Sequence, residues 1–186
     1  MKFNGSYEFE TQKLKVWEKL NNTEVLKNCI DGCKEFISID KNKYKAKIFV
    51  KLGPVNTSFQ SVIKIENIVE EESYDIEAKG NAGQLGNASG KIKVSLEENN
   101  NKTILSYQAE TRINGKLAQL GSRLIDGSVK KNTDIFFKNF SKNLDDQNQV
   151  YSETEKNIDN SYTSKKVFLY LSLFFFLILI IGFYVK

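Results

Sequence analysis

The sequence feature that most constrains the fold is an alternation of apolar and polar residues that recurs along the middle of the chain. A period of two places successive side chains on opposite faces of a β-strand, so each alternating run predicts a strand with one covered and one wet face. The runs occupy residues 44–52, 57–65, 74–80, 90–96 and 105–111. Gly53 and Pro54 separate the first two runs, which favours a hairpin. The pattern therefore predicts an antiparallel sheet with a single covered side.

The N-terminal part of the chain adds one strand and two short helices to this prediction. Residues 3–9 alternate in the same way and predict a strand. Thr11 is placed to cap a first helix over residues 14–20. A second helix is expected to begin at Thr23 and to end by Gly32. The expected order is a strand, two helices and then the remaining strands.

A long amphipathic helix over residues 114–144 is expected to cover the sheet. As a helix this segment is about 45 Å long, enough to cross the whole sheet. Its apolar residues recur at three- and four-residue intervals, and they are Leu117, Leu120, Leu124, Ile135, Phe136, Phe140 and Leu144. The predicted fold class is α+β, with a curved antiparallel sheet wrapped around a long C-terminal helix.

The space between the sheet and this helix admits two interpretations. Several inward positions are small or weakly polar, among them Ser61, Ala78 and Gly80. Such positions are consistent with an apolar cavity that binds a ligand. They are equally consistent with a dry core in which small and large side chains interlock.

An uncharged apolar run from Val167 to Val185 is the second strong constraint. As a helix it is about 28 Å long, close to the thickness of the hydrocarbon core of a bilayer. The alternative is a buried core helix, but such helices are rarely so long without a polar stripe. We therefore expect one transmembrane helix. Its lipid-facing residues are expected to include Val167, Phe174, Leu177, Ile180 and Val185.

These features divide the chain into a domain over residues 1–144, a linker over residues 145–166 and a membrane anchor over residues 167–185. The linker is predicted because its sequence is polar and shows no periodicity. The N-terminus lacks the features of a secretory signal. We therefore expect a C-terminal tail anchor in the inner (cytoplasmic) membrane, with the domain in the cytoplasm.

The composition argues against several classes of function. The chain contains no histidine, which removes the commonest general base and the commonest metal ligand. No arrangement of the remaining residues suggests a catalytic site or a metal site, so the sequence predicts a protein that is not an enzyme. The net charge of +4 is too small to favour nucleic-acid binding. Cys29 and Cys33 are expected to be reduced structural residues.

Three segments of the chain carry a resemblance to a known family. They are LKNCIDGC at residues 26–33, VKLGPV at residues 50–55 and GKLAQLGSRLIDG at residues 115–127. In this order they resemble the CoxG family of carbon monoxide dehydrogenase subunits over residues 1–144. That family belongs to the START-like (SRPBCC) helix-grip superfamily. The resemblance implies a sheet that grips a long helix around a hydrophobic ligand cavity.

The resemblance also implies a function and a set of site residues. It implies an accessory protein that attaches a molybdenum-containing dehydrogenase of the carbon monoxide dehydrogenase type to the membrane, or that carries quinone to it. The expected cavity lining is Val50, Leu52, Phe59, Ile76, Tyr107, Leu117, Leu120, Gly121 and Leu124. The expected gates of the cavity are two hairpins, formed by Gly53, Pro54 and Val55 and by Gly83, Leu85 and Gly86.

Two alternatives remain open at this stage. The first is a pure docking protein that recruits the dehydrogenase and has a solid interior. The second is a lipid-processing enzyme on the same fold, which the absence of histidine disfavours.

Overall fold

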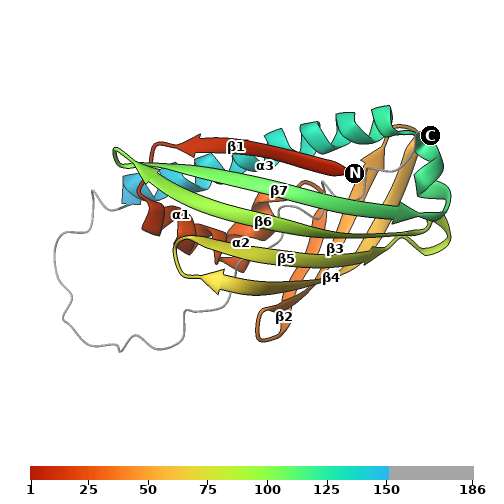
Figure 1. Ribbon diagram of the computed structural model, residues 1–186, viewed down its shortest axis with the longest axis horizontal. Coiled ribbons are helices and arrows are strands. Elements are labelled where there is room, and N and C mark those ends of the chain that lie inside the picture. Colours follow the sequence, from red (N-terminus) through yellow and green to blue (C-terminus); the bar gives the residue numbers. More distant parts are fainter. Residues whose placement is uncertain (151–186) are drawn as a thin grey trace.

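The computed structural model describes residues 1–150, and these residues form an antiparallel sheet of seven strands in the order β1-β7-β6-β5-β4-β3-β2 (Figure 1). The strands are β1 (Lys2–Phe9), β2 (Cys33–Asp40), β3 (Lys43–Leu52), β4 (Val55–Val69), β5 (Ser73–Asn81), β6 (Asn87–Asn99) and β7 (Lys102–Asn114). The helices are α1 (Lys13–Leu20), α2 (Thr23–Cys29) and α3 (Ser122–Val150), with short 3-10 helices η1 (Gly83–Leu85) and η2 (Gly115–Leu120).

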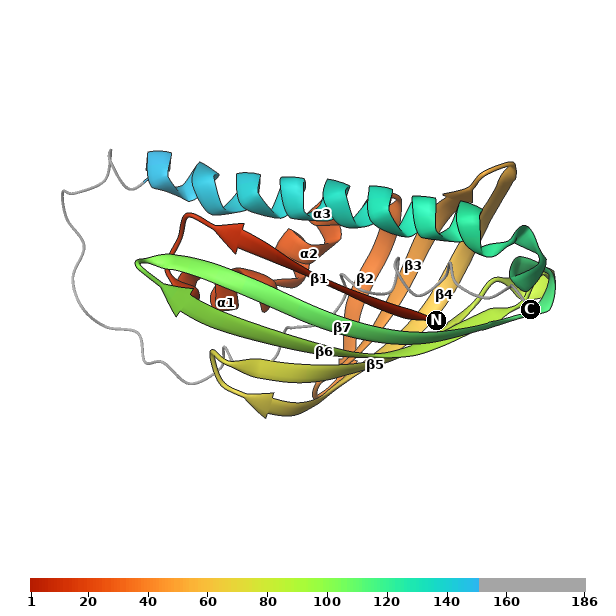
Figure 2. The same cartoon turned by 45° about the horizontal axis from the view of Figure 1, so that its top comes forward.

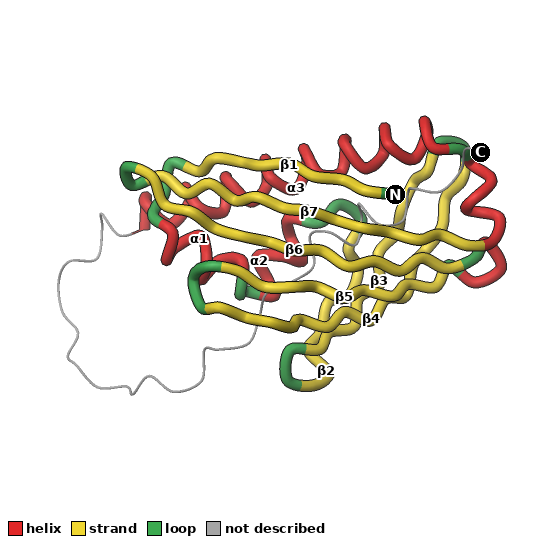
Figure 3. Tube along the Cα trace, in the orientation of Figure 1, coloured by secondary structure: helices red, strands yellow, loops and turns green. Residues whose placement is uncertain are grey.

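Helix α3 covers one face of the sheet along its length. Figure 2 shows α3 running across the sheet, with α1 and α2 packed beneath its C-terminal half. Figure 3 shows that the strands follow one another through short turns, apart from the helical connection between β1 and β2. The predicted α+β architecture, a sheet wrapped around a C-terminal helix, is confirmed for the described residues.

The alternation in the sequence correctly predicts which side chains face α3. On β3 the residues Tyr44, Ala46 and Ile48 are buried, whereas the lysines between them are exposed. The same two-residue pattern continues through β5, β6 and β7. The interior is therefore apolar because every central strand contributes one apolar face to it.

The sequence pattern does not predict β2. This strand lies at the edge of the sheet, where only one neighbour covers it. Phe36 is buried, but Ile37 and Ile39 are exposed. Buried and exposed residues do not alternate clearly along β2, so this strand lacks the period-two pattern that marks the other strands.

The two short helices form as predicted, but the cap of α1 differs. Its N-cap is Gln12, which makes no side-chain capping bond, and not Thr11. The backbone carbonyl of Thr11 instead accepts a 2.6 Å hydrogen bond from the hydroxyl of Thr103 on β7. Helix α2 is capped by Asn22, whose side-chain oxygen accepts hydrogen bonds from the backbone N–H groups of residues 24 and 25.

The helix that covers the sheet begins later than the sequence predicts. Residues 115–120 form η2, and Gly121 then adopts a positive φ of 83°, so α3 begins at Ser122. This break resets the helical phase, which determines the residues of α3 that face the sheet. As a result Ile125, Val129 and Phe137 are buried against the sheet, whereas Leu124 points to solvent. The prediction of one helix from residue 114 was wrong at this end.

At its other end α3 continues to Val150, six residues past Leu144. The start of the predicted linker is thus helical, because adding a residue to an existing helix costs little once the helix has nucleated. Among the described residues, no helix combines the length and the apolar character needed to cross a bilayer. The predicted anchor over residues 167–185 lies outside the described residues.

Candidate functional site

Most of the predicted cavity residues lie in the interior between the sheet and the helical segments that cover it. Six of them are buried in the common core, in agreement with their predicted inward direction. These six are Val50, Leu52, Phe59, Ile76, Tyr107 and Leu117. They come from β3, β4, β5, β7 and η2, so the fold brings together segments that are far apart in the sequence.

The remaining three predicted lining residues lie elsewhere. Leu120 is half-buried at the end of η2. Leu124 is 46% exposed, because the phase reset at the start of α3 turns it away from the sheet. An added Cβ on Gly121 would meet no atom within 4 Å, so this glycine permits a turn of positive φ and not a close approach of two backbones.

The two hairpins predicted as gates have different surroundings. An added Cβ on Gly53 would lie 3.5 Å from the side chain of Leu124, so the β3–β4 turn sits beside the start of α3. In the β5–β6 turn, an added Cβ on Gly86 would lie only 1.9 Å from the backbone oxygen of Asn114. The second turn is therefore packed backbone against backbone on the β7–η2 connection.

A groove of about 710 Å³ lies between the edge strand β1 and the N-terminal half of α3. Residues 1–7 form one wall, and Tyr107 of β7 contributes to it. The wall on α3 is made by Asp126, Val129, Lys130, Thr133 and Asp134. The groove therefore runs along the seam between the sheet and the helix.

Aromatic rings line the inner side of this groove. Tyr7 stacks on Phe137 with ring centroids 3.5 Å apart. Tyr107 lies directly opposite Gly5 in the β1–β7 register, and an added Cβ on Gly5 would lie 2.6 Å from the Tyr107 hydroxyl. The glycine thus leaves room for the Tyr107 ring to cross over the edge strand.

A polar cluster closes the outer side of the groove. The Tyr7 hydroxyl donates a 2.7 Å hydrogen bond to Oδ1 of Asp134, and Lys130 donates one of 2.9 Å to Oδ2. These two donors, Lys130 first and Tyr7 second, lower the pKa of Asp134. Burial, and then the bond to Asp134, raises the pKa of Tyr7. At neutral pH the cluster is therefore a neutral phenol bound to an ionised carboxylate.

Two buried hydroxyl groups in the described part of the interior have no hydrogen-bond partner. They belong to Ser61 on β4 and to Thr133, which lines the groove from α3. A buried hydroxyl without a partner costs about 1–3 kcal/mol. Both groups can therefore gain energy from a polar atom brought into the interior.

The sequence does not reveal this groove. Its walls come from residues 1–7, 107 and 126–134, which no local pattern connects. One signal was available, since Gly5 interrupts the apolar face of an otherwise regular strand and such a glycine often marks a close approach.

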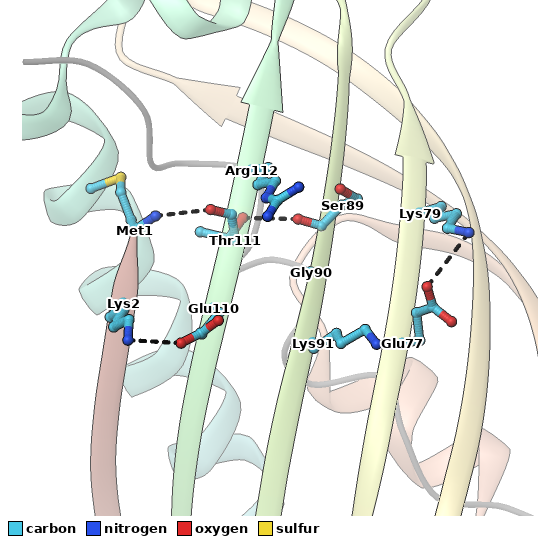
Figure 4. A pocket seen from close by; sticks show the side chains of 10 residues that line it. All are labelled: Met1, Lys2, Glu77, Lys79, Ser89, Gly90, Lys91, Glu110, Thr111 and Arg112. Carbon is cyan, nitrogen blue, oxygen red and sulfur yellow. Dashed lines mark hydrogen bonds and ion pairs between the residues drawn. The ribbon is translucent and has the colours of Figure 1, made fainter.

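A second hollow, of about 400 Å³, lies on the opposite, outer face of the sheet. Figure 4 shows its charged lining, in which Lys2 pairs with Glu110 at 2.9 Å and Lys79 with Glu77 at 3.5 Å. The N-terminal amine of Met1 donates a 2.8 Å hydrogen bond to the backbone oxygen of Thr111. This hollow is shallow and charged, so it does not suit an apolar ligand.

Both cysteines are free, as predicted. Burial raises the pKa of Cys29 to about 12 and that of Cys33 to about 11. Thiols with such values remain protonated at neutral pH and are poor nucleophiles and poor metal ligands. Within residues 1–150, no three or more His, Cys, Asp or Glu side chains are grouped so that they could hold a metal ion.

A sheet that curves around one long C-terminal helix, with an apolar interior reached along their seam, defines the START-like class of folds. Solved structures agree with this assignment. A conserved protein from Geobacillus kaustophilus shares 28% identity, with a TM-score of 0.75 over 79% of this chain and 97% of that one. A START superfamily protein from Mycobacterium smegmatis shares the fold at 6% identity, with a TM-score of 0.58 over 78% of this chain and 98% of that one.

A third structure with this fold is the Zhui aromatase/cyclase from Streptomyces sp. R1128, at 10% identity and a TM-score of 0.56, covering 79% of this chain and 94% of that one. No curated protein sequence matches the chain significantly. The family model for the CoxG subunit of carbon monoxide dehydrogenase matches residues 5–145. The chain therefore belongs to the CoxG family.

Proposed function

We propose that this chain is an accessory protein of a carbon monoxide dehydrogenase-type oxidoreductase, and that it binds a hydrophobic molecule between its sheet and α3. The observation that carries the proposal is the groove beside β1, which lies along the seam between the sheet and α3 and is lined in part by Tyr7, Tyr107 and Val129. Membership of the CoxG family supplies the association with the dehydrogenase. Catalysis stays in the partner enzyme, which we propose to be a cytoplasmic molybdenum hydroxylase.

The chemistry of the groove suits a ligand that is mostly apolar and carries a few polar atoms. Its inner wall offers the Tyr7 and Tyr107 rings and the side chain of Val129. Burying apolar ligand surface there yields about 25 cal/mol per Å². The buried hydroxyl of Thr133, which lines the groove, is a donor for an oxygen atom on such a ligand.

A quinone has this combination of features. Its isoprenoid tail is apolar, and its ring carbonyls are hydrogen-bond acceptors. In the proposed function the segment 167–185 anchors the chain in the inner membrane, where quinones dissolve, and the domain presents the quinone to the dehydrogenase in the cytoplasm. A membrane lipid is the other ligand of the same chemistry, and the test distinguishes the two.

The hairpins around Gly53 and Gly83 are proposed to move when the ligand enters. The β3–β4 turn supports this role better, because Leu124 is the neighbour that an added side chain at Gly53 would contact. The β5–β6 turn would first have to separate from Asn114, whose backbone oxygen lies close to Gly86.

The experiment uses the full-length chain, purified from membranes in mild detergent. Its organic extract is analysed by mass spectrometry for quinones and phospholipids. The empty protein is then titrated with a short-chain quinone while the fluorescence of Trp17 is recorded. Trp17 is the chain's one tryptophan, and it is buried against Tyr74, with ring centroids 6.0 Å apart. We expect co-purified quinone and saturable quenching.

A matched pair of variants tests whether the ligand binds in the groove. Val129→Phe adds a ring inside the groove, and Lys131→Phe adds a ring to the exposed side of the same helix, away from the groove and the hairpins. We expect Val129→Phe to weaken quinone quenching and Lys131→Phe to leave it unchanged. A chain that purifies without quinone or lipid, and that shows no saturable quenching, would rule out the ligand-binding function.

The closely packed core under α3 favours a second candidate, a pure docking protein. Phe136 and Phe140 stack with centroids 5.7 Å apart, and Phe9 packs on Phe140 at 5.4 Å. If the chain acts only by docking, Val129→Phe will retain the dehydrogenase in a pull-down and will support electron transfer to the membrane at the wild-type rate. Loss of electron transfer with retained pull-down would instead support ligand delivery.

A further inference from the structure

The outer face of the sheet, which points away from α3, divides into two parts that differ in charge. Across β1, β7, β6, β5 and β4 the strand register creates a row of alternating charge. In this row, which we call the charge row, each side chain lies opposite one of the other sign, in the order Lys2, Glu110, Lys91, Glu77 and Lys64. Figure 4 shows the part of the row from Lys2 to Glu77. This half of the face neutralises itself.

The half around β3 is neutralised only in part. The exposed positions of β3 are Lys43, Lys45, Lys47, Phe49 and Lys51. Their partners on β4 are Lys64, Val62, Gln60, Ser58 and Asn56, so no carboxylate lies opposite them on that side. On β2, Glu35 is opposite Lys47 and Asp40 is opposite Lys43. Among the described residues, none of these four lysines forms an ion pair.

Large apolar side chains lie among these lysines. Phe49 is 48% exposed, Ile37 on β2 is 45% exposed and Val62 on β4 is 43% exposed. Ile37 and Val62 flank Lys45 from either side in the register, so they belong to the same patch. We call this patch the β3 surface, made of Ile37, Lys43, Lys45, Lys47, Phe49, Lys51 and Val62.

Protection of a sheet edge does not explain the β3 surface. Lysines on the exposed edge of a sheet often prevent that edge from pairing with another chain. However, β3 is an inner strand with β2 and β4 on its two sides. An exposed phenylalanine, isoleucine and valine amid unpaired lysines also lower solubility. We therefore expect the β3 surface to contact a partner.

The composition of the patch identifies the chemistry of that partner. Protein–protein interfaces are depleted in lysine and use arginine instead. Surfaces that bind single-stranded nucleic acid stack bases on several aromatic side chains, whereas Phe49 is the one aromatic residue in this patch. A bilayer that contains anionic lipids suits both components, because lysine amines pair with phosphate groups while apolar side chains enter the interface.

We propose that the β3 surface binds face-on to an anionic lipid bilayer. The lysines of β3 lie over the headgroups, and Phe49, Ile37 and Val62 enter the interfacial layer. This contact sets the orientation of the domain on the membrane. It leaves the groove beside β1 free, because β1 and β3 are separated by four strands in the sheet.

The test uses the full-length chain in liposomes, with a fluorescent reporter at the proposed contact. In a Trp17→Phe background, Phe49→Trp places a tryptophan on the β3 surface. The matched control, Gln108→Trp, places it on the exposed side of β7, within the self-neutralising half. Brominated phospholipids quench a tryptophan that touches the bilayer. We expect quenching of Phe49→Trp, and not of Gln108→Trp, in liposomes with anionic lipid.

A charge variant tests the role of the lysines. At about fivefold per lysine, the triple change Lys45→Gln, Lys47→Gln and Lys51→Gln should reduce the ratio of bound to unbound domains about 100-fold. The control removes three exposed lysines from α3 by Lys131→Gln, Lys138→Gln and Lys142→Gln. It should leave the quenching of Phe49→Trp unchanged. Equal circular dichroism spectra and melting temperatures establish that all variants are folded.

Other results would overturn the proposal. Quenching of the two reporters to the same extent would mean that the β3 surface is not the contact. Quenching that persists in liposomes of neutral lipid alone would mean that the lysines do not direct it. If the fluorescence of the Phe49→Trp reporter changed only when the dehydrogenase is added, the patch would instead be a protein-docking surface.

Discussion

The hydroxyl of Tyr7 lies 2.7 Å from Oδ1 of Asp134, and this hydrogen bond joins the edge strand β1 to α3. The two residues are far apart in the sequence, but the fold places them across the mouth of the groove. The ring of Tyr7 also stacks on Phe137 from the same helix. Tyr7 therefore joins β1 to α3 through both a polar contact and an aromatic contact.

The first prediction concerns this polar contact. Tyr7→Phe removes the hydroxyl and keeps the ring on Phe137. We expect the free energy of unfolding to fall by about 0.5–1.5 kcal/mol, because the bond is exposed to water and is therefore worth less than a buried bond to a charged group. Chemical denaturation of wild type, Tyr7→Phe, Asp134→Asn and the double variant measures the coupling energy. A coupling near zero would mean that the bond contributes nothing to stability.

The second prediction is a pH dependence. The pKa of Asp134 in the folded protein is lowered below its ordinary value of 3.8. A lowered pKa means that the ionised carboxylate stabilises the fold above the ordinary value, and that this contribution is lost as the pH falls through the folded value. The difference in melting temperature between wild type and Asp134→Asn should be constant from pH 5 to pH 7 and shrink below about pH 4. A difference that grows on acidification would contradict this assignment.

The third prediction compares two glycines. Gly86 has a φ of 125°, and an added Cβ would lie 1.9 Å from the Asn114 oxygen. Gly86→Ala should therefore destabilise the protein by more than about 2 kcal/mol. Gly127 lies inside α3, and an added Cβ there would meet nothing within 4 Å. Gly127→Ala should stabilise the protein by about 0.5–1 kcal/mol. Thermal or urea unfolding measures both values.

The fourth prediction tests the phase of α3. Ile125 is 1% exposed, whereas its neighbour Leu124 is 46% exposed. Ile125→Ala should cost about 2–5 kcal/mol of stability, and Leu124→Ala less than about 1 kcal/mol. Urea denaturation of the two variants in parallel measures the two losses of stability. The reverse order would indicate a continuous helix from residue 114, as the apolar spacing alone suggests.

The inward faces of the sheet could be predicted from the sequence because burial and side-chain period are linked directly in a strand. This link predicted the buried residues of β3 and of β5 to β7. It fails for β2, where an edge position exposes Ile37 and Ile39 although both are apolar. Composition alone cannot tell an apolar residue that packs inward from one that is left on a surface.

The start of α3 and the groove could not be predicted from the sequence, for two different reasons. Leu117, Leu120 and Leu124 have helical spacing, but the positive φ of Gly121 separates Leu124 from the other two. A glycine inside a helical pattern does not reveal whether it bends the chain or continues the helix. The groove depends on pairs such as Tyr7 with Asp134 and Gly5 with Tyr107, which only the tertiary fold brings together.

The charge row has a consequence for how the strands find their partners. A shift of two residues between neighbouring strands keeps every apolar side chain on the inner face, so the hydrophobic pattern cannot reject it. In one direction, such a shift would place Lys79 opposite Lys91 between β5 and β6, and Lys91 opposite Arg112 between β6 and β7, where the native register pairs Lys91 with Glu77 and Glu110. Like charges directly opposite each other are destabilising. Electrostatics thus disfavours the misalignment in this direction, which burial alone would leave equal to the native register.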